Sequence, residues 1–109
     1  LGDDGAAALA QALADCASLE VLNFTDCGVG RAGLEAVAAQ VPRWPRLRAL
    51  GAYSNPGPSD ALARALAAAL PSLPDAESFV LQYSGLSEGV MAELEAAKAA
   101  TGSGVELYL

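Results

Sequence analysis

Residues 19–34, LEVLNFTDCGVGRAGL, contain the pattern that decides the fold. Leu19, Leu22 and Phe24 occupy the apolar positions of a frame L-x-x-L-x-L, which suits a short β-strand with one buried face. Residues 28–33 contain three glycines, which are typical of a turn, and an alanine-rich stretch typical of a helix follows them. The stretch therefore predicts a strand, a turn and a helix, in that order.

The same frame recurs three more times, at offsets of 28, 29 and 28 residues, and nine of its twelve positions are Leu or Phe. A unit that returns at a nearly constant spacing indicates a repeat protein, in which each unit buries its apolar face against its neighbours. We therefore expect parallel strands, adjacent in sequence order, near residues 20–24, 48–52, 77–81 and 105–109. The later copies of the frame are Leu47, Leu50 and Ala52, then Ala76, Phe79 and Leu81, then Gly104, Leu107 and Leu109.

An apolar stripe at helical spacing accompanies each unit, so we expect one helix per unit, all packed on the same side of the strands. Proline or glycine pairs then end each helix before the next strand. These boundaries predict a single domain, 1–109, made of a partial repeat 1–18, full repeats 19–46, 47–75 and 76–103, and a partial repeat 104–109. The stripes are Leu9 and Leu13, then Leu34, Val37 and Val41, then Leu62, Leu66 and Leu70, then Met91 and Leu94. The first helix is expected at about residues 5–17.

Small side chains that can form hydrogen bonds recur three residues after each frame, and a second repeated position follows two residues later. The first set is Cys27, Asn55 and Ser84, and the second is Val29, Gly57 and Leu86. These residues resemble the repeat of the ribonuclease-inhibitor-like leucine-rich-repeat family, L-x-x-L-x-L-x-x-N/C-x-L-G-x-x-G followed by a helix. The resemblance covers nearly the whole chain. It implies an α/β solenoid, a right-handed horseshoe segment with short parallel strands inside and helices outside.

The glycines of the family pattern are present in the opening partial repeat, as Gly2 and Gly5, and in the first full copy, as Gly30 and Gly33. The alignment places Pro58 and Ala61 at these two positions in the second copy, and Ser87 and Val90 in the third. Proline is compatible with a turn or a first helical position, because its missing N–H needs no partner there.

Residues between the framed positions are expected on the concave face, and all three tyrosines of the chain belong to this set. Tyrosine is enriched at protein interfaces because it combines rigid apolar area with a polar tip. Alternatively, these tyrosines only cover neighbouring aliphatic atoms on an exposed strand. As candidate partner-binding residues of this face we select Asn23, Asp26, Tyr53, Gln82, Tyr83 and Tyr108.

Trp44 is a further candidate, because it is the only tryptophan and lies in the segment 43–48, which holds three of the six basic residues. Tryptophan and arginine are common among residues that dominate binding energy. In the alternative interpretation, Trp44 caps a helix–strand corner while the arginines neutralise acids such as Glu20 and Asp75.

The composition excludes several classes of chemistry. The chain has no histidine, which removes imidazole acid–base catalysis and the common nucleophile triads. We expect no metal ion and no cofactor, because ligand-type residues are absent or scattered. The net charge of −7 disfavours nucleic acid and suits either solubility or a basic partner. The small number of cysteines predicts a reducing, intracellular environment, and we expect the cytoplasm. No apolar run is long enough to predict a membrane span.

These features predict a protein–protein interaction module or a structural subunit of a larger assembly, and not an enzyme. The alternative is a GTPase-activating regulator, since Ran GTPase-activating proteins look similar at the level of the repeat. Arg31, on a strand-to-helix loop, would be its residue to test.

The ends of the chain form a second expected contact surface. The sequence opens inside a repeat and stops at Leu109, a framed residue, and neither end carries a recognisable polar cap. Unpaired parallel strand edges invite pairing with other chains. We therefore expect an end to be covered by further sequence, by a second copy of the chain or by another subunit.

Overall fold

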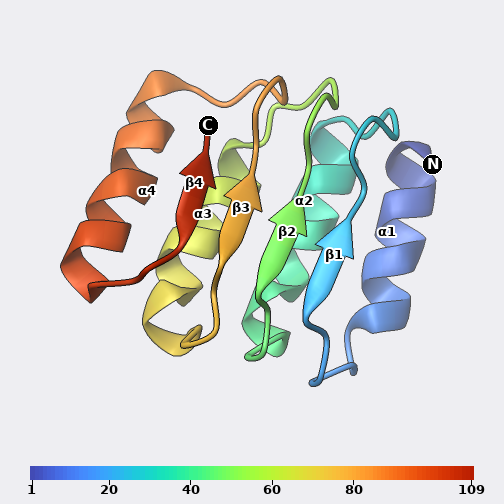
Figure 1. The fold of residues 1–109 in the computed structure, drawn as a ribbon. Helices are drawn as coiled ribbons and strands as arrows, with labels where there is room; N and C mark the ends of the chain where they lie inside the picture. The colour runs from blue at the N-terminus through green and yellow to red at the C-terminus, as the bar shows by residue number, and fades with distance from the viewer.

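Strands and helices alternate along the whole of residues 1–109 in the computed structural model (Figure 1). The four strands are parallel and pair in the order β1-β2-β3-β4. They are β1 (Val21–Asn23), β2 (Ala49–Gly51), β3 (Ser78–Val80) and β4 (Glu106–Tyr108). The strands thus lie within the predicted segments, and their parallel pairing in sequence order is confirmed.

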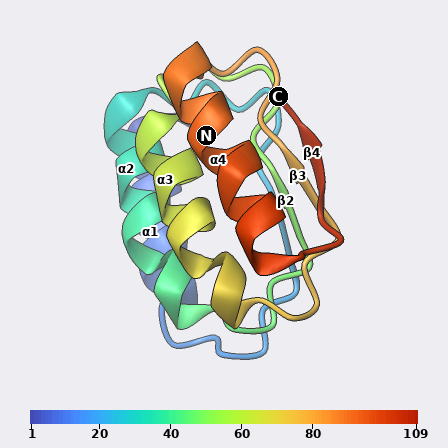
Figure 2. The same ribbon diagram turned by 90° about the vertical axis from the view of Figure 1, so that its left-hand side faces the viewer.

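One α-helix precedes each strand, and all four helices lie on the same face of the sheet (Figures 1 and 2). The helices are α1 (Gly2–Leu13), α2 (Arg31–Gln40), α3 (Asp60–Ala69) and α4 (Glu88–Thr101). Two short 3-10 helices, η1 (Val41–Arg43) and η2 (Leu70–Ser72), continue α2 and α3. The result is an α/β arrangement with one helical layer and one open side of the sheet.

The first helix begins and ends earlier than predicted. It spans Gly2–Leu13 and not residues 5–17, because the chain turns directly after Leu13. The Leu13 carbonyl accepts a hydrogen bond from the Cys16 N–H at 2.9 Å and another from the Trp44 indole Nε1 at 2.9 Å. A carbonyl with these two partners is part of a turn, and the helix stops there.

The core lies between the sheet and the helices. The central residue of each of the first three strands is buried, and its two neighbours are not, as alternation along a strand requires. Together with the helix stripes these residues form one continuous apolar cluster. Its largest fully buried members are Trp44, Phe24, Phe79, Leu34, Leu47, Leu50, Leu62, Leu66, Leu81 and Leu94.

Two framed or striped positions differ from the prediction. In α4 it is Val90, and not Met91, that is buried together with Leu94, which is four residues further along the same helix face. Near the last strand Gly104 has no side chain to bury, and the neighbouring Val105 is fully buried instead.

Three loops lead from a strand to the next helix, and we call them the first loop (24–30), the second loop (52–59) and the third loop (81–87). Each contains a non-glycine residue with positive φ and then a glycine with positive φ. One residue separates the two in the first and third loops, but two residues, Asn55 and Pro56, separate them in the second. The non-glycine residues are Asp26, Ser54 and Tyr83, and the glycines are Gly28, Gly57 and Gly85.

This extra residue corrects the predicted alignment. The helices begin three residues after Gly28, Gly57 and Gly85, so Pro58 occupies the place of Val29 and not that of Gly30. The residue equivalent to Gly30 in the second loop is Ser59, since both are the N-cap residues of their helices. The second loop is therefore one residue longer than the other two.

Candidate functional site

The face of the sheet that carries no helix is the surface on which the sequence placed its candidate residues, and Figure 1 is seen from this side. None of the outward-facing side chains of the strands and adjoining loop residues is buried. We call this surface the open face. It consists of Val21, Asn23, Thr25 and Asp26, then Ala49, Gly51, Tyr53 and Ser54, then Ser78, Val80, Gln82 and Tyr83, then Glu106 and Tyr108.

The strand register aligns the open-face residues in rows across the sheet. One row consists of Asn23, Gly51, Val80 and Tyr108, which are register partners on the four strands. The Asn23 side chain lies across Gly51, where a Cβ would come within 2.9 Å of Asn23 Oδ1. Its Oδ1 also accepts a hydrogen bond from the Thr25 N–H at 3.0 Å. The absence of a side chain at Gly51 therefore makes room for the Asn23 amide to lie against the sheet.

Tyr53 and Tyr83 form an aromatic pair at the carboxyl end of the strands. Their ring centroids are 5.4 Å apart and the rings are perpendicular, a favourable edge-to-face arrangement. Tyr83 is 76% exposed and Tyr53 is 37% exposed. The pair thus presents apolar ring surface and two hydroxyl groups to solvent.

The backbone of the loops determines how this pair is displayed. Asp26, Ser54 and Tyr83 stand at the same repeat position and have φ values of 53°, 59° and 54°. A positive φ is uncommon for any residue with a side chain and most uncommon for a bulky one such as tyrosine. The Ser54 N–H donates to the Gln82 carbonyl at 3.0 Å, which ties the second loop to the third next to Tyr83.

Tyr108 occupies the last strand together with Glu106, two residues before it on the same face. The Tyr108 hydroxyl donates a hydrogen bond to the Glu106 carboxylate. This hydrogen bond raises the pKa of Tyr108, and the negative charge of the carboxylate acts in the same direction. The phenol thus serves as a hydrogen-bond donor to the carboxylate of its own strand.

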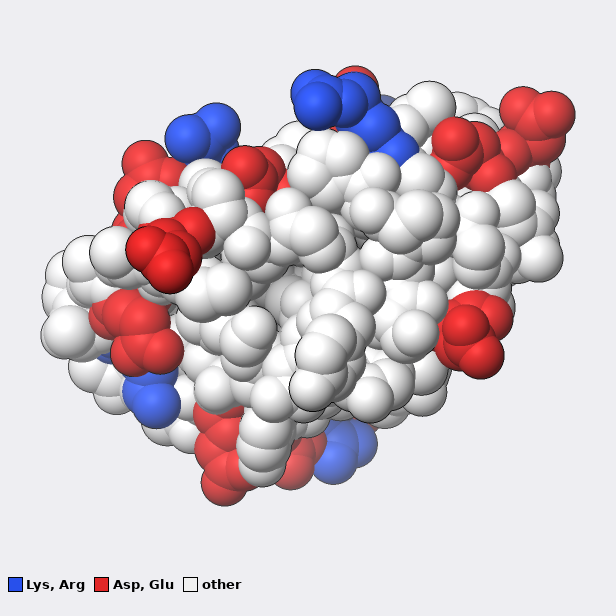
Figure 3. Space-filling view, turned by 90° about the horizontal axis from the view of Figure 1, so that it is seen from above, with Lys and Arg blue, Asp and Glu red and all other residues white.

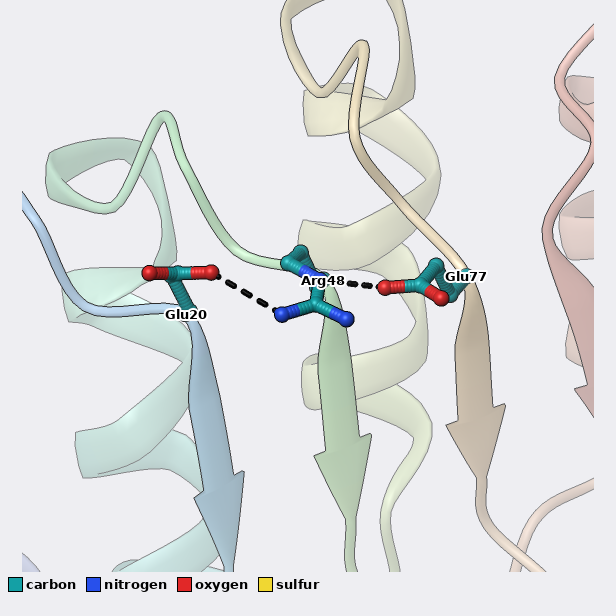
Figure 4. A network of polar contacts seen from close by, with 3 residues as sticks. All are labelled: Glu20, Arg48 and Glu77. Carbon is teal, nitrogen blue, oxygen red and sulfur yellow. Dashed lines mark hydrogen bonds and ion pairs between the residues drawn. The ribbon is translucent and has the colours of Figure 1, made fainter.

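An acid–base–acid ladder crosses three strands at their amino ends (Figure 4). Arg48 lies between Glu20 and Glu77, with Nη1 at 3.0 Å from Glu20 Oε1 and Nε bound to Glu77 Oε2. The hydrogen bond to Glu77, and then that to Glu20, raises the pKa of the guanidinium. The three residues occupy one repeat position at offsets of 28 and 29 residues, and this spacing could have revealed the ladder. The sequence prediction named Glu20 correctly but named Asp75, which forms no ion pair, in place of Glu77.

The structure contradicts the prediction that Trp44 contacts a partner. Trp44 is completely buried, and its indole Nε1 donates a hydrogen bond to the Leu13 carbonyl at 2.9 Å. The tryptophan therefore joins the end of α1 to the turn before β2, as the alternative interpretation had it. Arg43 from the same segment pairs with Asp15 at 3.1 Å.

Charged groups outside the open face form no concentrated site. Seen from the end of the molecule at which the strands stop, acidic and basic side chains lie around the periphery and the centre is uncharged (Figure 3). Arg31, the first residue of α2, is exposed and forms no ion pair. No group of three acidic or thiol side chains is arranged so that it could hold a metal ion. None of the helices has the length and apolar character that crossing a lipid bilayer requires.

The fold and this surface together define a class of protein, a small α/β chain whose parallel sheet is covered by helices on one side and open on the other. Comparison of the sequence with protein-family models and with curated proteins gave no match.

Proposed function

We propose that the chain is a segment of a leucine-rich-repeat solenoid of the ribonuclease-inhibitor type, and that it serves as a protein–protein interaction module or as a structural subunit of an assembly. In this proposal the open face is the concave side of the solenoid and binds the partner. The strand register supports the repeat, because Leu22, Leu50, Phe79 and Leu107 are aligned partners at offsets of 28, 29 and 28 residues. The placement of every helix on one side supports it as well.

One observation carries the proposed interaction. All aromatic side chains of the open face are exposed, namely Tyr53, Tyr83 and Tyr108, whereas the three aromatic residues elsewhere in the chain are buried. Val21 on the same face is 57% exposed. Exposed aromatic and aliphatic groups on one continuous sheet surface are typical of a protein interface.

The edge strands are proposed as a second contact surface. β1 pairs only with β2, and β4 pairs only with β3, so each has one edge whose backbone groups are free to pair with a subunit or another copy. We further propose an intracellular setting, in which the thiols of Cys16 and Cys27 remain reduced.

Site-specific photo-crosslinking tests the proposed function. Benzoylphenylalanine is introduced at Gln82, on the open face, or at Ala92, which is exposed on α4, and each protein is irradiated in an extract of the source cells. The partner captured at Gln82 is then purified and its affinity for the chain is measured by calorimetry. We expect Tyr53→Ala and Tyr83→Ala each to weaken binding by about 1–3 kcal/mol, because each removes a large interface side chain.

Glu35→Ala is the control, because Glu35 is exposed on α2, on the helical side of the sheet, and forms no ion pair. It should leave the affinity unchanged. Circular dichroism establishes that each variant is folded. Capture through Ala92 alone, or unchanged affinity of both tyrosine variants in their folded state, would show that the open face is not the binding surface.

A further inference from the structure

The charges on the open face and its strand ends are unequal. Strand segments 20–26, 48–54, 77–83 and 105–109 contain four carboxylates and a single guanidinium. That guanidinium, Arg48, is held between two of the carboxylates. Of the other two, Asp26 has no ion-pair partner, and Glu106 is bound only by the Tyr108 hydroxyl. The surface therefore has an uncompensated negative charge and no free cation of its own.

One of these acidic residues, Asp26, lies on the loop next to that of Tyr53. The Asp26 N–H donates to the Tyr53 carbonyl at 2.7 Å, so Asp26 and Tyr53 are backbone neighbours on adjacent loops. Tyr83 stands at the same repeat position as Asp26, two loops further along, and its ring meets that of Tyr53 at 90°. Two perpendicular aromatic rings thus lie at the carboxyl end of the open face, and Asp26 lies on the loop next to that of Tyr53. We call Asp26, Tyr53 and Tyr83 the Tyr–Asp cluster.

The chemistry of the Tyr–Asp cluster favours binding of a cation. The faces of tyrosine rings carry partial negative charge and attract cations, and a carboxylate without a partner attracts the same charge. A guanidinium suits this arrangement better than an ammonium, because it is planar, stacks on an aromatic ring and presents paired N–H donors to a carboxylate.

We propose that the Tyr–Asp cluster binds an arginine side chain of a basic segment in the partner protein. This inference rests on the proposed function, since the arginine belongs to the protein that the open face binds. Tyr53 and Tyr83 supply the stacking surface, and Asp26 accepts the guanidinium hydrogen bonds. The net charge of −7 on the chain draws such a segment towards this surface.

A short peptide provides the test. The probe is a fluorescein-labelled nine-residue glycine–serine peptide with two arginines, and binding to the whole chain is followed by fluorescence polarisation and by NMR. We expect shifts of the Tyr53 and Tyr83 ring resonances and of the Asp26 amide. The same peptide with citrulline in place of arginine keeps the shape and loses the charge, and it should not bind. Added salt should weaken the interaction, as it does for exposed charges.

Variants of the chain separate a local site from general charge attraction. Asp26→Asn and Tyr83→Ala should each weaken binding of the arginine peptide, by about fivefold. Asp4→Asn is the control, because Asp4 is an exposed carboxylate on α1 without an ion pair, and its loss changes the net charge equally. It should leave the affinity nearly unchanged.

Three outcomes overturn the proposal. Equal binding of the citrulline peptide would show that charge is not recognised, and equal weakening by Asp4→Asn and Asp26→Asn would show attraction without a site. If the arginine peptide fails to bind while the captured partner still depends on Tyr53 and Tyr83, the open face is an interface for an apolar segment. The proposed function then stands and the arginine site does not.

Discussion

The three loops meet at two junctions. The first junction lies between the first and second loops, and the second junction lies between the second and third loops. The same repeat position forms different contacts at the two junctions. At the first junction Asn55 is buried and forms four hydrogen bonds with backbone groups. It accepts from the N–H groups of Cys27 at 3.1 Å and Val29 at 3.0 Å. It donates to the carbonyls of Phe24 at 3.1 Å and Ala52 at 2.9 Å. One amide side chain thus holds two loops together.

At the second junction the equivalent residue is Ser84, whose hydroxyl is bound only to the Leu81 carbonyl and the Ser59 hydroxyl. Pro58 stands where Val29 stands in the first loop, and proline has no N–H for a side chain to accept. The backbones are also closer, because a Cβ on Gly57 would lie 2.0 Å from the Ser84 carbonyl oxygen. Two features therefore explain why Asn55 and Ser84 differ. One is the set of N–H groups that the preceding loop offers to a side chain, and the other is the space between the loops.

The largest expected effect comes from Asn55→Ala, which should reduce the free energy of unfolding by about 3–4 kcal/mol. The substitution leaves two N–H groups and two carbonyls without their partners at a buried site. Urea denaturation followed by circular dichroism measures the change. Asn23→Ala is the matched control, because the Asn23 amide is exposed and accepts one hydrogen bond. A loss of stability no larger than that of Asn23→Ala would contradict the bridging role of Asn55.

A smaller loss is expected from Ser84→Asn, which places the residue of the first junction at the second. If asparagine were favourable at every such position, the substitution would stabilise the protein. We expect instead a destabilisation of about 2 kcal/mol, because the larger side chain would be crowded against the buried Ser59 hydroxyl, which Ser84 contacts, and Pro58 has no N–H to donate. The unfolding free energy measures this, and an increase in stability would refute the explanation based on Pro58.

The smallest effect is expected from Ser84→Ala, at about 1 kcal/mol, because it leaves the buried Ser59 hydroxyl and the Leu81 carbonyl without one partner. The Ser59 side chain forms no capping hydrogen bond to α3. Removing the Ser59 hydroxyl therefore loses little stability beyond its hydrogen bond with Ser84. The double variant Ser59→Ala/Ser84→Ala should therefore be no less stable than Ser84→Ala alone. A strictly additive loss would show that the two hydroxyl groups act independently.

The strands and most of the core could be predicted from the sequence, because the alternation of residues such as Leu22 and Phe24 reflects burial on one face. The position of the extra residue in the second loop could not. The offset of 29 residues shows that one copy is longer, but only the backbone angles of Ser54 and Gly57 place the addition at Asn55 and Pro56.

The candidate surface could likewise be predicted only in part from the sequence. The outward direction of Tyr53 follows from strand alternation, and the sequence predicted it. Its contact with Tyr83 could not be predicted, since these residues occupy different repeat positions and meet because Tyr83 has a positive φ. A structural role for Trp44 was one of the two interpretations of the sequence, but its hydrogen-bond partner, the Leu13 carbonyl 31 residues away, could not be predicted.

The additional residue of the second loop has a consequence for protein engineering. The helix-to-strand half has the same length in the units of α2, α3 and α4, and the change in loop length is confined to a surface turn at Pro56, which is exposed. The strands on either side nevertheless remain in register. This turn is thus a natural place to graft a foreign peptide, because the molecule already accommodates an insertion there without disturbing the sheet.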